Sequence, residues 1–541
     1  MNSPEDGIAS LILYLLTVVL AVTLLPAQSG SKLTVSQTPA PASGLNDDTA
    51  ATELYHESYR PQFHFTPAKN WMNDPNGPIY YEGEYHLFYQ YNPFSIEWGH
   101  MSWGHAVSRD LVHWEHLPIA LSEENGIMIF SGSTVVDRHN SSGFCQGAEA
   151  KTPSCLVAIY TGHSEKLETQ NLAYSNDRGR TWTKYADNPV VDLHLASFRD
   201  PKVFWHEDAR QWVMVTVLAS QHKVRFFGSA DLKHWTALSD FGPAGATWGV
   251  WECPDLFPLP VDGDASQTKW VLSINSPRGA ARGWSNQYFV GSFDGKTFSP
   301  ESSTEKPLWV DYGLDFYAST SFSDLPKSDK RHIWLGWLTN WEFGARMPPD
   351  QWRGEQSIPR EVKLKRFADG IHLVQEPIVE LQVLRARHTI VENRSIEAAN
   401  HLLNSKKVRG ETLEITAEIS SGDASEFGLR VREGDGEETL IGVDTKKQTL
   451  FVDRSRSSGV SFDEHFPRRD AGPITLVEGK SVKLHIFVDR ESVEIFGNDG
   501  ETVISETIFP KQGSDRIEVY SLGGRARVLK MDVWNLKSIY Q

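Results

Sequence analysis

The sequence has few cysteines, an excess of negative over positive charge, and only one long apolar run. Three cysteines among 541 residues exclude a scaffold held together by many disulfides. Lysine and arginine number 53 against 70 acidic residues, and the net charge of −17 disfavours a phosphate backbone as partner. No long stretch keeps the 3.6-residue apolar period of an amphipathic helix. We therefore expect a large, acidic, strand-rich protein without a nucleic-acid partner.

Several common kinds of catalytic site are also missing. The 19 histidines show no clustered spacing typical of metal ligands. There is no Gly-x-Ser-x-Gly elbow, no phosphate-binding glycine loop and no Cys-x-x-Cys pair. The segment His113-Trp114-Glu115-His116 pairs two histidines, but its spacing is not that of a zinc-binding His-Glu-x-x-His. We expect neither a metal nor a cofactor.

The one strongly apolar run covers residues 8–27 and predicts a secretory signal peptide within residues 1–30. Its length also approaches that of a membrane span, and Glu5 and Asp6 stand where a positive flank is usual, so an uncleaved anchor stays open. Residues 31–58 are rich in Ser, Thr, Ala and Pro, which is typical of a disordered spacer or propeptide. Either way we expect a secreted, extracellular protein, or a vacuolar or membrane-anchored one with its catalytic part outside the cytosol.

Cysteine positions and glycosylation triplets fit such a compartment. Cys145 and Cys155 lie close enough in sequence to close a local disulfide, which leaves Cys253 as a free thiol. Asn140 and Asn393 each begin an Asn-x-Ser triplet and are possible N-glycosylation sites.

An uneven repeat runs through residues 59–385. Asp110, Asp177, Asp231 and Asp294 each follow a serine by two residues and precede an aromatic residue. Such an Asp can bond the backbone of its own turn. Repeats of roughly 55–65 residues, each about four strands long, are typical of β-propeller blades, and five blades would fit the length.

The character of the chain changes after residue 385, where these repeats stop and tryptophan nearly vanishes. Segments 482–488 and 492–496 alternate apolar and polar residues, as strands of an antiparallel sandwich do. We expect residues 386–541 to form a β-sandwich with a packing role rather than a carbohydrate-binding one. The fold class is thus all-β, a catalytic propeller followed by a sandwich.

Three short acid-bearing segments suggest the chemistry. Asp74, Asp200 and Glu252 each stand beside Pro, Trp or Phe, a setting that indicates a fixed and partly dry pocket. Two carboxyl groups on either side of a glycosidic bond are what sugar hydrolysis requires, and a third can hold substrate hydroxyls. A turn-forming role is the alternative for any one of them alone.

The neighbours of each acid suggest its role. The Asn-Asp-Pro-Asn-Gly turn should stabilise Asp74 as an anion, which suits a nucleophile. The apolar neighbours of Glu252 favour its protonated form, which suits the general acid and base. The guanidinium of Arg199 should favour an ionised Asp200, which suits a transition-state stabiliser.

The three segments, in this order, closely resemble glycoside hydrolase family 32, the β-fructofuranosidases, which include invertases, inulinases and levanases. The resemblance covers roughly residues 60–541. It implies a five-bladed propeller with a sandwich, a retaining mechanism without cofactor, and the same three roles for Asp74, Asp200 and Glu252. It further implies a set of substrate-binding residues: Asn73, Gln90, Trp98, Phe130, Ser131, Arg199, Tyr317 and Trp341.

The resemblance therefore predicts an exo-acting hydrolase that removes terminal fructose from sucrose or from inulin-type or levan-type fructans. A fructosyltransferase that uses the same fructosyl-enzyme stays open, because the sequence does not resolve the acceptor. A catalytically dead sugar-binding homologue is disfavoured by the intact Asp74, Asp200 and Glu252. Sequence leaves the oligomeric state open, and a membrane is a partner only if the N-terminal segment is uncleaved.

Overall fold

The computed structural model describes residues 54–146, 154–276, 285–477 and 480–540. The predicted signal peptide or anchor, and the spacer up to residue 53, lie outside the described residues. Within the described ranges, no helix is long and apolar enough to cross a membrane. The secondary structure is dominated by strands, as predicted.

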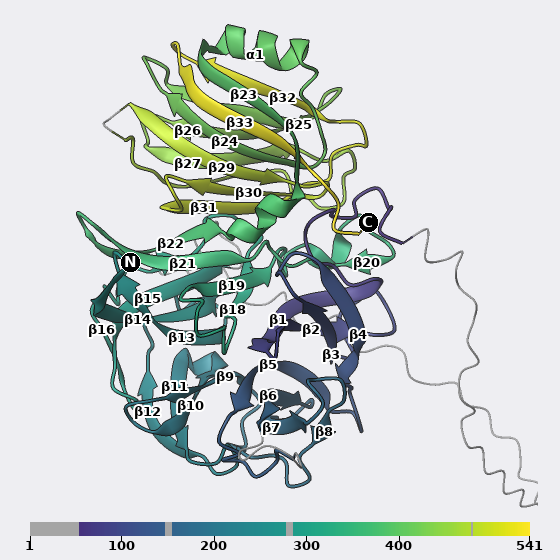
Figure 1. The fold of residues 1–541 in the computed structure, drawn as a ribbon, viewed down its shortest axis with the longest axis vertical. Coiled ribbons are helices and arrows are strands. Elements are labelled where there is room, and N and C mark those ends of the chain that lie inside the picture. Colours follow the sequence, from purple (N-terminus) through teal and green to yellow (C-terminus); the bar gives the residue numbers. More distant parts are fainter. Residues whose placement is uncertain (1–53, 147–153, 277–284, 478–479, 541) are drawn as a thin grey trace, which may run out of the picture. The chain divides into compact units, whose positions relative to one another are not determined.

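The first part of the chain forms antiparallel sheets whose strands follow one another in sequence (Figure 1). Three of these sheets contain β1 (Asn70–Tyr81), β2 (Glu84–Asn92), β3 (Ser102–Ser108) and β4 (Trp114–Leu121); β5 (Met128–Asp137), β6 (Cys155–His163), β7 (Glu168–Ser175) and β8 (Thr183–Lys184); and β9 (Phe198–His206), β10 (Gln211–Leu218), β11 (Lys223–Ser229) and β12 (Thr236–Phe241). A short strand, β20 (Trp352–Arg353), joins the edge of the first sheet beside β1. A 3₁₀ turn (Ala219–Gln221) links β10 to β11.

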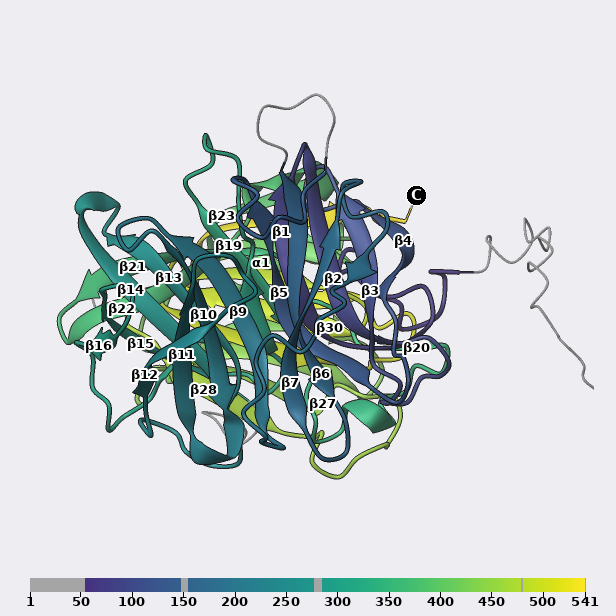
Figure 2. The ribbon, with the colours of Figure 1, turned by 90° about the horizontal axis from the view of Figure 1, so that it is seen from below.

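Two further groups of strands are linked into one nine-stranded sheet, because β13 and β21 pair at Val261 and Leu364. The first group is β13 (Glu252–Val261), β14 (Asp264–Ser276), β15 (Ser285–Phe293) and β16 (Phe298–Pro300), with β17 (Leu308–Trp309) beside β15. The second is β18 (Tyr317–Ser321), β19 (His332–Trp337), β21 (Arg360–Phe367) and β22 (Gly370–Pro377). The strand order accommodates the five predicted blades, whose inner strands β1, β5, β9, β13 and β18 lie around a common centre (Figure 1). Figure 2 shows β1, β5, β9 and β13 after a turn of 90°.

The repeated Asp turns occupy the same place in successive sheets, directly after β3, β7, β11 and β15. The carboxylate of Asp110 accepts from the amides of Val112 at 3.0 Å and His113 at 2.8 Å. The carboxylate of Asp231 likewise accepts from the amides two and three residues further along the chain. The prediction that the Asp bonds its own turn is confirmed, and the turn fixes the step from the third strand of a blade to the fourth.

Residues from β23 onward form two packed antiparallel sheets, the predicted sandwich (Figure 1). One sheet contains β23 (Arg385–Ser395), β33 (Arg527–Leu536), β24 (Leu413–Ser420), β29 (Ser481–Val488), β30 (Ser492–Gly497) and β31 (Thr502–Thr507); the other contains β28 (Arg469–Pro473), β27 (Thr449–Arg456), β26 (Glu438–Asp444), β25 (Glu426–Glu433) and β32 (Arg516–Leu522). Between them lies a core made of Val, Ile, Leu and Phe side chains. One α-helix, α1 (Ile396–Ser405), was not predicted; the side chain of Ser395 caps it by accepting from the amide of Ala398.

Buried charges join the sandwich to the propeller. Arg360 of β21 donates to Glu494 of β30 and to Asp311 at 3.1 Å, and all three side chains are wholly or almost wholly buried. His64 bonds Asp489 at 2.8 Å and Glu494 at 2.9 Å with its two ring nitrogens. A buried charge is costly unless it is paired, so these contacts require the two parts to stay together.

The cysteines and the glycosylation triplets have defined places. Cys145 and Cys155 are joined by a disulfide, and Cys253 is free and buried. The side-chain amide of Asn140 is engaged with the backbone of Cys145, whereas Asn393 is exposed and accepts from Arg527 at 2.7 Å. Glycosylation at either asparagine stays a prediction.

Candidate active site

The three predicted catalytic acids lie near the starts of three inner strands, β1, β9 and β13. Asp74 is in β1, Asp200 is the third residue of β9, and Glu252 is the first residue of β13. Each inner strand has an irregularity in its pairing near this end, for example between Glu252 and Asp255. Such bulges redirect side chains, and Asp200 and Cys253 accordingly have positive φ angles of 61° and 45°.

The thiol of Cys253 links two of the acids. Its sulfur lies 3.5 Å from Oδ2 of Asp74 and 3.7 Å from Oδ2 of Asp200. The backbone amide of the same cysteine donates to Asp200 at 2.9 Å. Because Glu252 is its neighbour in the chain, Cys253 brings all three carboxyl groups into one site.

Asp74 is held by two donors. Ser131 of β5 donates to Oδ2 at 2.6 Å, and the amide of Asn73 donates to Oδ1 at 3.0 Å. Asn73 is itself fixed, because its own oxygen accepts from the indole of Trp71 at 2.7 Å. One carboxylate oxygen therefore has a fixed orientation toward the pocket.

Glu252 is held by a cation and a phenol. Arg199 donates from Nη2 to Oε1 at 3.0 Å, and the hydroxyl of Tyr317 donates to Oε2 at 2.5 Å. Arg199 also donates from Nη1 to both carboxylate oxygens of Glu168 at 3.0 Å. The guanidinium thus bridges two carboxylates.

The direction of the pKa shift that the sequence suggested for two acids was wrong. Burial raises the pKa of Asp74, although Ser131 and Asn73 act to lower it. Asp74 also lies in a strand and not in a turn. Burial raises the pKa of Asp200 to about 8, against the lowering effect of Arg199 and with a further increase from Glu252. Arg199 is next to Asp200 in the sequence, but its guanidinium approaches the carboxylate of Asp200 only to 4.0 Å. Its shorter bonds go to the other two carboxylates, Glu168 and Glu252.

A pocket of about 500 Å³ opens above these acids. Its lining includes all three acids and most of the predicted substrate-binding residues: Asn73, Gln90, Trp98, Phe130, Ser131, Arg199 and Trp341. Tyr317 lies beneath the pocket and reaches it through Glu252. The indole of Trp98 is 43% exposed and meets Trp341 and Phe130 nearly edge-on, so aromatic side chains form one wall.

Three lining residues were missed by the sequence analysis: His163, Glu168 and Ala196. The ring of His163 stacks on Phe130 at 4.1 Å and bonds Glu168 at 3.1 Å. Glu168 begins β7 without any distinctive neighbours, and its importance becomes visible only when the fold places it beside Arg199. No local signal could have identified it.

Carboxyl groups that converge in a polar, aromatic-walled pocket define a glycoside hydrolase site. The chain belongs to glycosyl hydrolase family 32: the family's N-terminal domain matches residues 64–377 and its C-terminal domain matches residues 380–535. The predicted family is therefore confirmed.

Similar proteins agree with this assignment. The chain is 50% identical over 499 residues to a levanase of Bacillus subtilis (strain 168), covering 91% of this chain and 72% of that protein. It is 42% identical over 524 residues to an extracellular exo-inulinase of Aspergillus niger, covering 90% and 96%. A crystal structure of the Aspergillus awamori exo-inulinase superposes with a TM-score of 0.82 at 39% identity, covering 90% of this chain and 99% of that one.

Proposed function

We propose that this protein is a retaining exo-β-fructosidase that hydrolyses terminal β-D-fructofuranosyl residues of inulin-type or levan-type fructans and of sucrose. The observation that carries the proposal is the arrangement of Asp74, Asp200 and Glu252 around the Cys253 thiol, at the base of one pocket. Relatives named levanase and exo-inulinase support the substrate class. One relative is named as an extracellular exo-inulinase, and together with the disulfide this supports a secreted enzyme.

In this mechanism Asp74 is the nucleophile. Its two donors, Ser131 and Asn73, stabilise the carboxylate and hold one oxygen toward the anomeric carbon. Attack displaces the leaving sugar and forms a fructosyl ester on Asp74, which water then hydrolyses. Because the donors are fixed before substrate arrives, little reorganisation accompanies attack.

Glu252 is the general acid and then the general base. It gives its proton to the leaving oxygen in the first step and takes one from water in the second. Tyr317 and Arg199 donate to its two oxygens, so both stabilise the anion that exists between the steps. Glu168 keeps Arg199 in place from the opposite side.

Asp200 binds the furanose hydroxyls. With its pKa raised to about 8 by burial, its carboxyl group carries a proton below neutral pH and can both donate and accept. Two neighbouring hydroxyls of a sugar ring match this pair of functions. These contacts should tighten as charge develops on the ring.

The aromatic wall formed by Trp98, Phe130 and Trp341 favours binding of a single terminal fructose. The test is to incubate purified protein separately with sucrose, inulin and levan and to follow early products by chromatography. The proposal requires free fructose from the first minutes. A ladder of short oligosaccharides with little fructose would indicate endo action, and longer products from sucrose would indicate a fructosyltransferase.

A further inference from the structure

A second cavity of about 400 Å³ lies at the opposite ends of the inner strands. The active-site acids stand near the starts of β9 and β13, whereas this cavity is lined by later residues of the same strands, residues 202–205 and 256–258. The ends of β5 and β18 complete its wall. It therefore opens on the far side of the propeller from the site described above.

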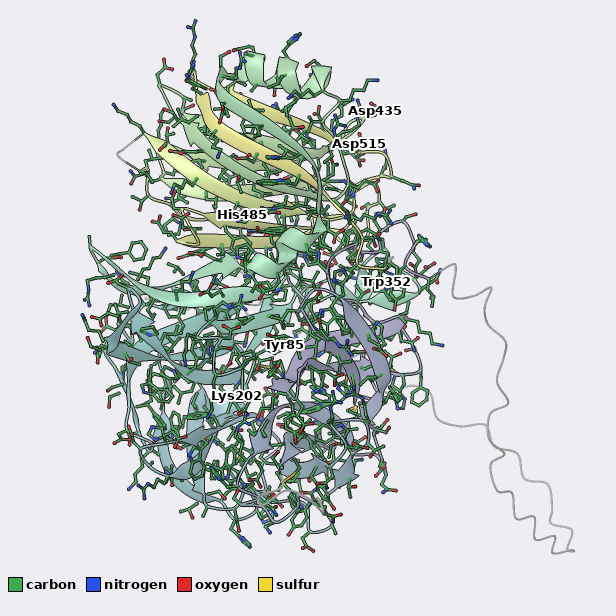
Figure 3. All side chains as sticks on the ribbon, in the orientation of Figure 1. Tyr85, Lys202, Trp352, Asp435, His485 and Asp515 are labelled. Atoms are coloured by element: carbon green, nitrogen blue, oxygen red, sulfur yellow. A yellow bond between two sulfur atoms is a disulfide. The ribbon has the colours of Figure 1, made fainter. Side chains whose placement is uncertain are left out.

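The cavity is separated from the active site by a polar layer. Lys202 is two residues beyond Asp200 and donates to the backbone oxygen and hydroxyl of Ser321 at 2.7 and 3.0 Å. Figure 3 places Lys202 inside the propeller. A cavity of about 20 Å³, lined by both Asp200 and Lys202, lies between the two sites. A space of that size holds about one water molecule and no sugar ring, so the second cavity is a site of its own.

Aromatic side chains form much of its lining. Trp205 and Trp270 are both half-buried, so each leaves part of its indole accessible. Trp205 packs against Trp212 at 5.3 Å, and Trp270 packs against Phe204 at 5.7 Å, so the rings are held by their neighbours. His332 stacks on Phe257 at 3.8 Å. Rigid, partly exposed rings of this kind bind ligands at little entropic cost.

Some polar groups of the cavity are paired with one another. Arg138 and Asp324 form an ion pair at 2.9 Å on its rim, and Glu207 accepts from the indole of Trp205 at 3.1 Å. Burial lowers the pKa of His332 to about 4, so its ring is neutral at ordinary pH. The lining therefore combines uncharged rings with charges that are balanced by a partner.

We propose that this cavity is a second carbohydrate-binding site, which holds a saccharide unit of a fructan chain while another chain end is cleaved. Indole faces offer surfaces for the C–H groups of a sugar, and the paired charges of Arg138 and Asp324 offer partners for its hydroxyls. The balance of Arg138 with Asp324 favours a neutral ligand over a phosphate or other anion. The identity of that ligand rests on the proposed function, since fructan is the neutral polymer that the enzyme would meet.

The proposal is tested by affinity electrophoresis of the full-length Asp74→Asn protein through gels that contain levan or inulin. In this background, Trp205→Ala and Trp270→Ala should each weaken retardation by roughly three- to tenfold, the loss expected for one aromatic contact. Trp235→Ala is the matched control, because Trp235, which directly precedes β12, is also half-buried but does not line the cavity.

With Asp74 intact, Trp205→Ala and Trp270→Ala should leave kcat/KM on sucrose unchanged and raise KM on long fructans. Retardation equal to that of the Trp235→Ala control in both variants would overturn the second site. Circular dichroism identifies a variant that has not folded, in which case the other variant decides. Failure of the proposed function has a different signature, because the unmodified enzyme would then release no fructose from any of the three substrates.

Discussion

Arg199 and Glu252 form the contact on which the site depends: Nη2 of the arginine donates to Oε1 of the glutamate at 3.0 Å. The same guanidinium is fixed by Glu168, which accepts from Nη1 with both of its oxygens. The proposed general acid is thus oriented by a cation whose own position is set by a carboxylate on a neighbouring sheet. Glu168 is a positioning residue in this account.

Glu168→Gln tests that chain of contacts. The amide cannot hold Arg199 as a charged pair, so the guanidinium should move and Glu252 should lose its orientation. We expect kcat on sucrose to fall roughly 10–100-fold with little change in KM, together with a shift in the basic limb of the pH profile. Steady-state kinetics across pH measures both. An unchanged pH profile beside a lowered melting temperature would leave Glu168 with a purely structural role.

Glu252→Gln removes the proton that the leaving group requires. Hydrolysis of sucrose should fall by about 10²–10⁴-fold, whereas a fructoside with a good leaving group should be affected far less in its first step. Comparing kcat/KM for the two substrates gives the result. Equal losses for both substrates would exclude Glu252 as the acid.

Cys253 should be unreactive despite its place among the acids. Burial raises the pKa of its thiol well above the ordinary value, and the charges of Asp200 and Asp74 raise it further. The folded protein should therefore resist a thiol-specific reagent at pH 8 and react only on unfolding. Cys253→Ser should keep most activity, while Cys253→Asp should lose at least about 10³-fold because an added carboxylate would face Asp74 and Asp200 in a buried site. Rapid labelling of the native enzyme would contradict this environment.

Glu355 and His64, at the contact between propeller and sandwich, should both contribute most stability in acid. Burial raises the pKa of Glu355 well above its ordinary value. Burial opposes protonation of His64, but Glu355 and the hydrogen bonds to Asp489 and Glu494 raise its pKa to about 10. As the pH rises above 4.5, the unfolded chain loses the Glu355 proton while the folded protein retains it, so stability falls. The contribution of His64 is complete below pH 6.5 and is likewise lost toward pH 10.

Thermal unfolding of Glu355→Gln at pH 5 and pH 8 tests whether Glu355 makes the folded protein less stable as the pH rises. The amide cannot ionise, so the melting temperature of the variant should exceed that of the unmodified protein at pH 8 and differ little from it at pH 5. Glu361→Gln, at a half-exposed acid of β21, is the control and should show no such pH dependence. A melting temperature above that of the unmodified protein at pH 5 but not at pH 8 would contradict this prediction.

The features that could be predicted from the sequence are those formed by residues close together in the chain. Asp110 and Asp231 bond amides two and three residues away, so their turns, and the blades that contain them, are visible in the chain itself. The bulge at Cys253 arises from pairing with a strand about twenty residues away, and the importance of Glu168 arises from Arg199, so neither left a local pattern. The ionisation of Asp200 was misjudged for the same reason: burial, which the fold imposes, outweighs the adjacent arginine.

The most direct test of the mechanism is to identify the residue that carries the fructosyl group. A Glu252→Ala variant should form the ester from a fructoside with a good leaving group and hydrolyse it slowly, because the general base is missing. Acid quenching, proteolysis and mass spectrometry then locate the adduct. The account predicts one added fructosyl group on the peptide that contains Asp74, and none when Asp74→Asn is combined with this variant. An adduct on the Asp200 peptide, or turnover by a folded Asp74→Asn protein at a near-normal rate, would contradict it.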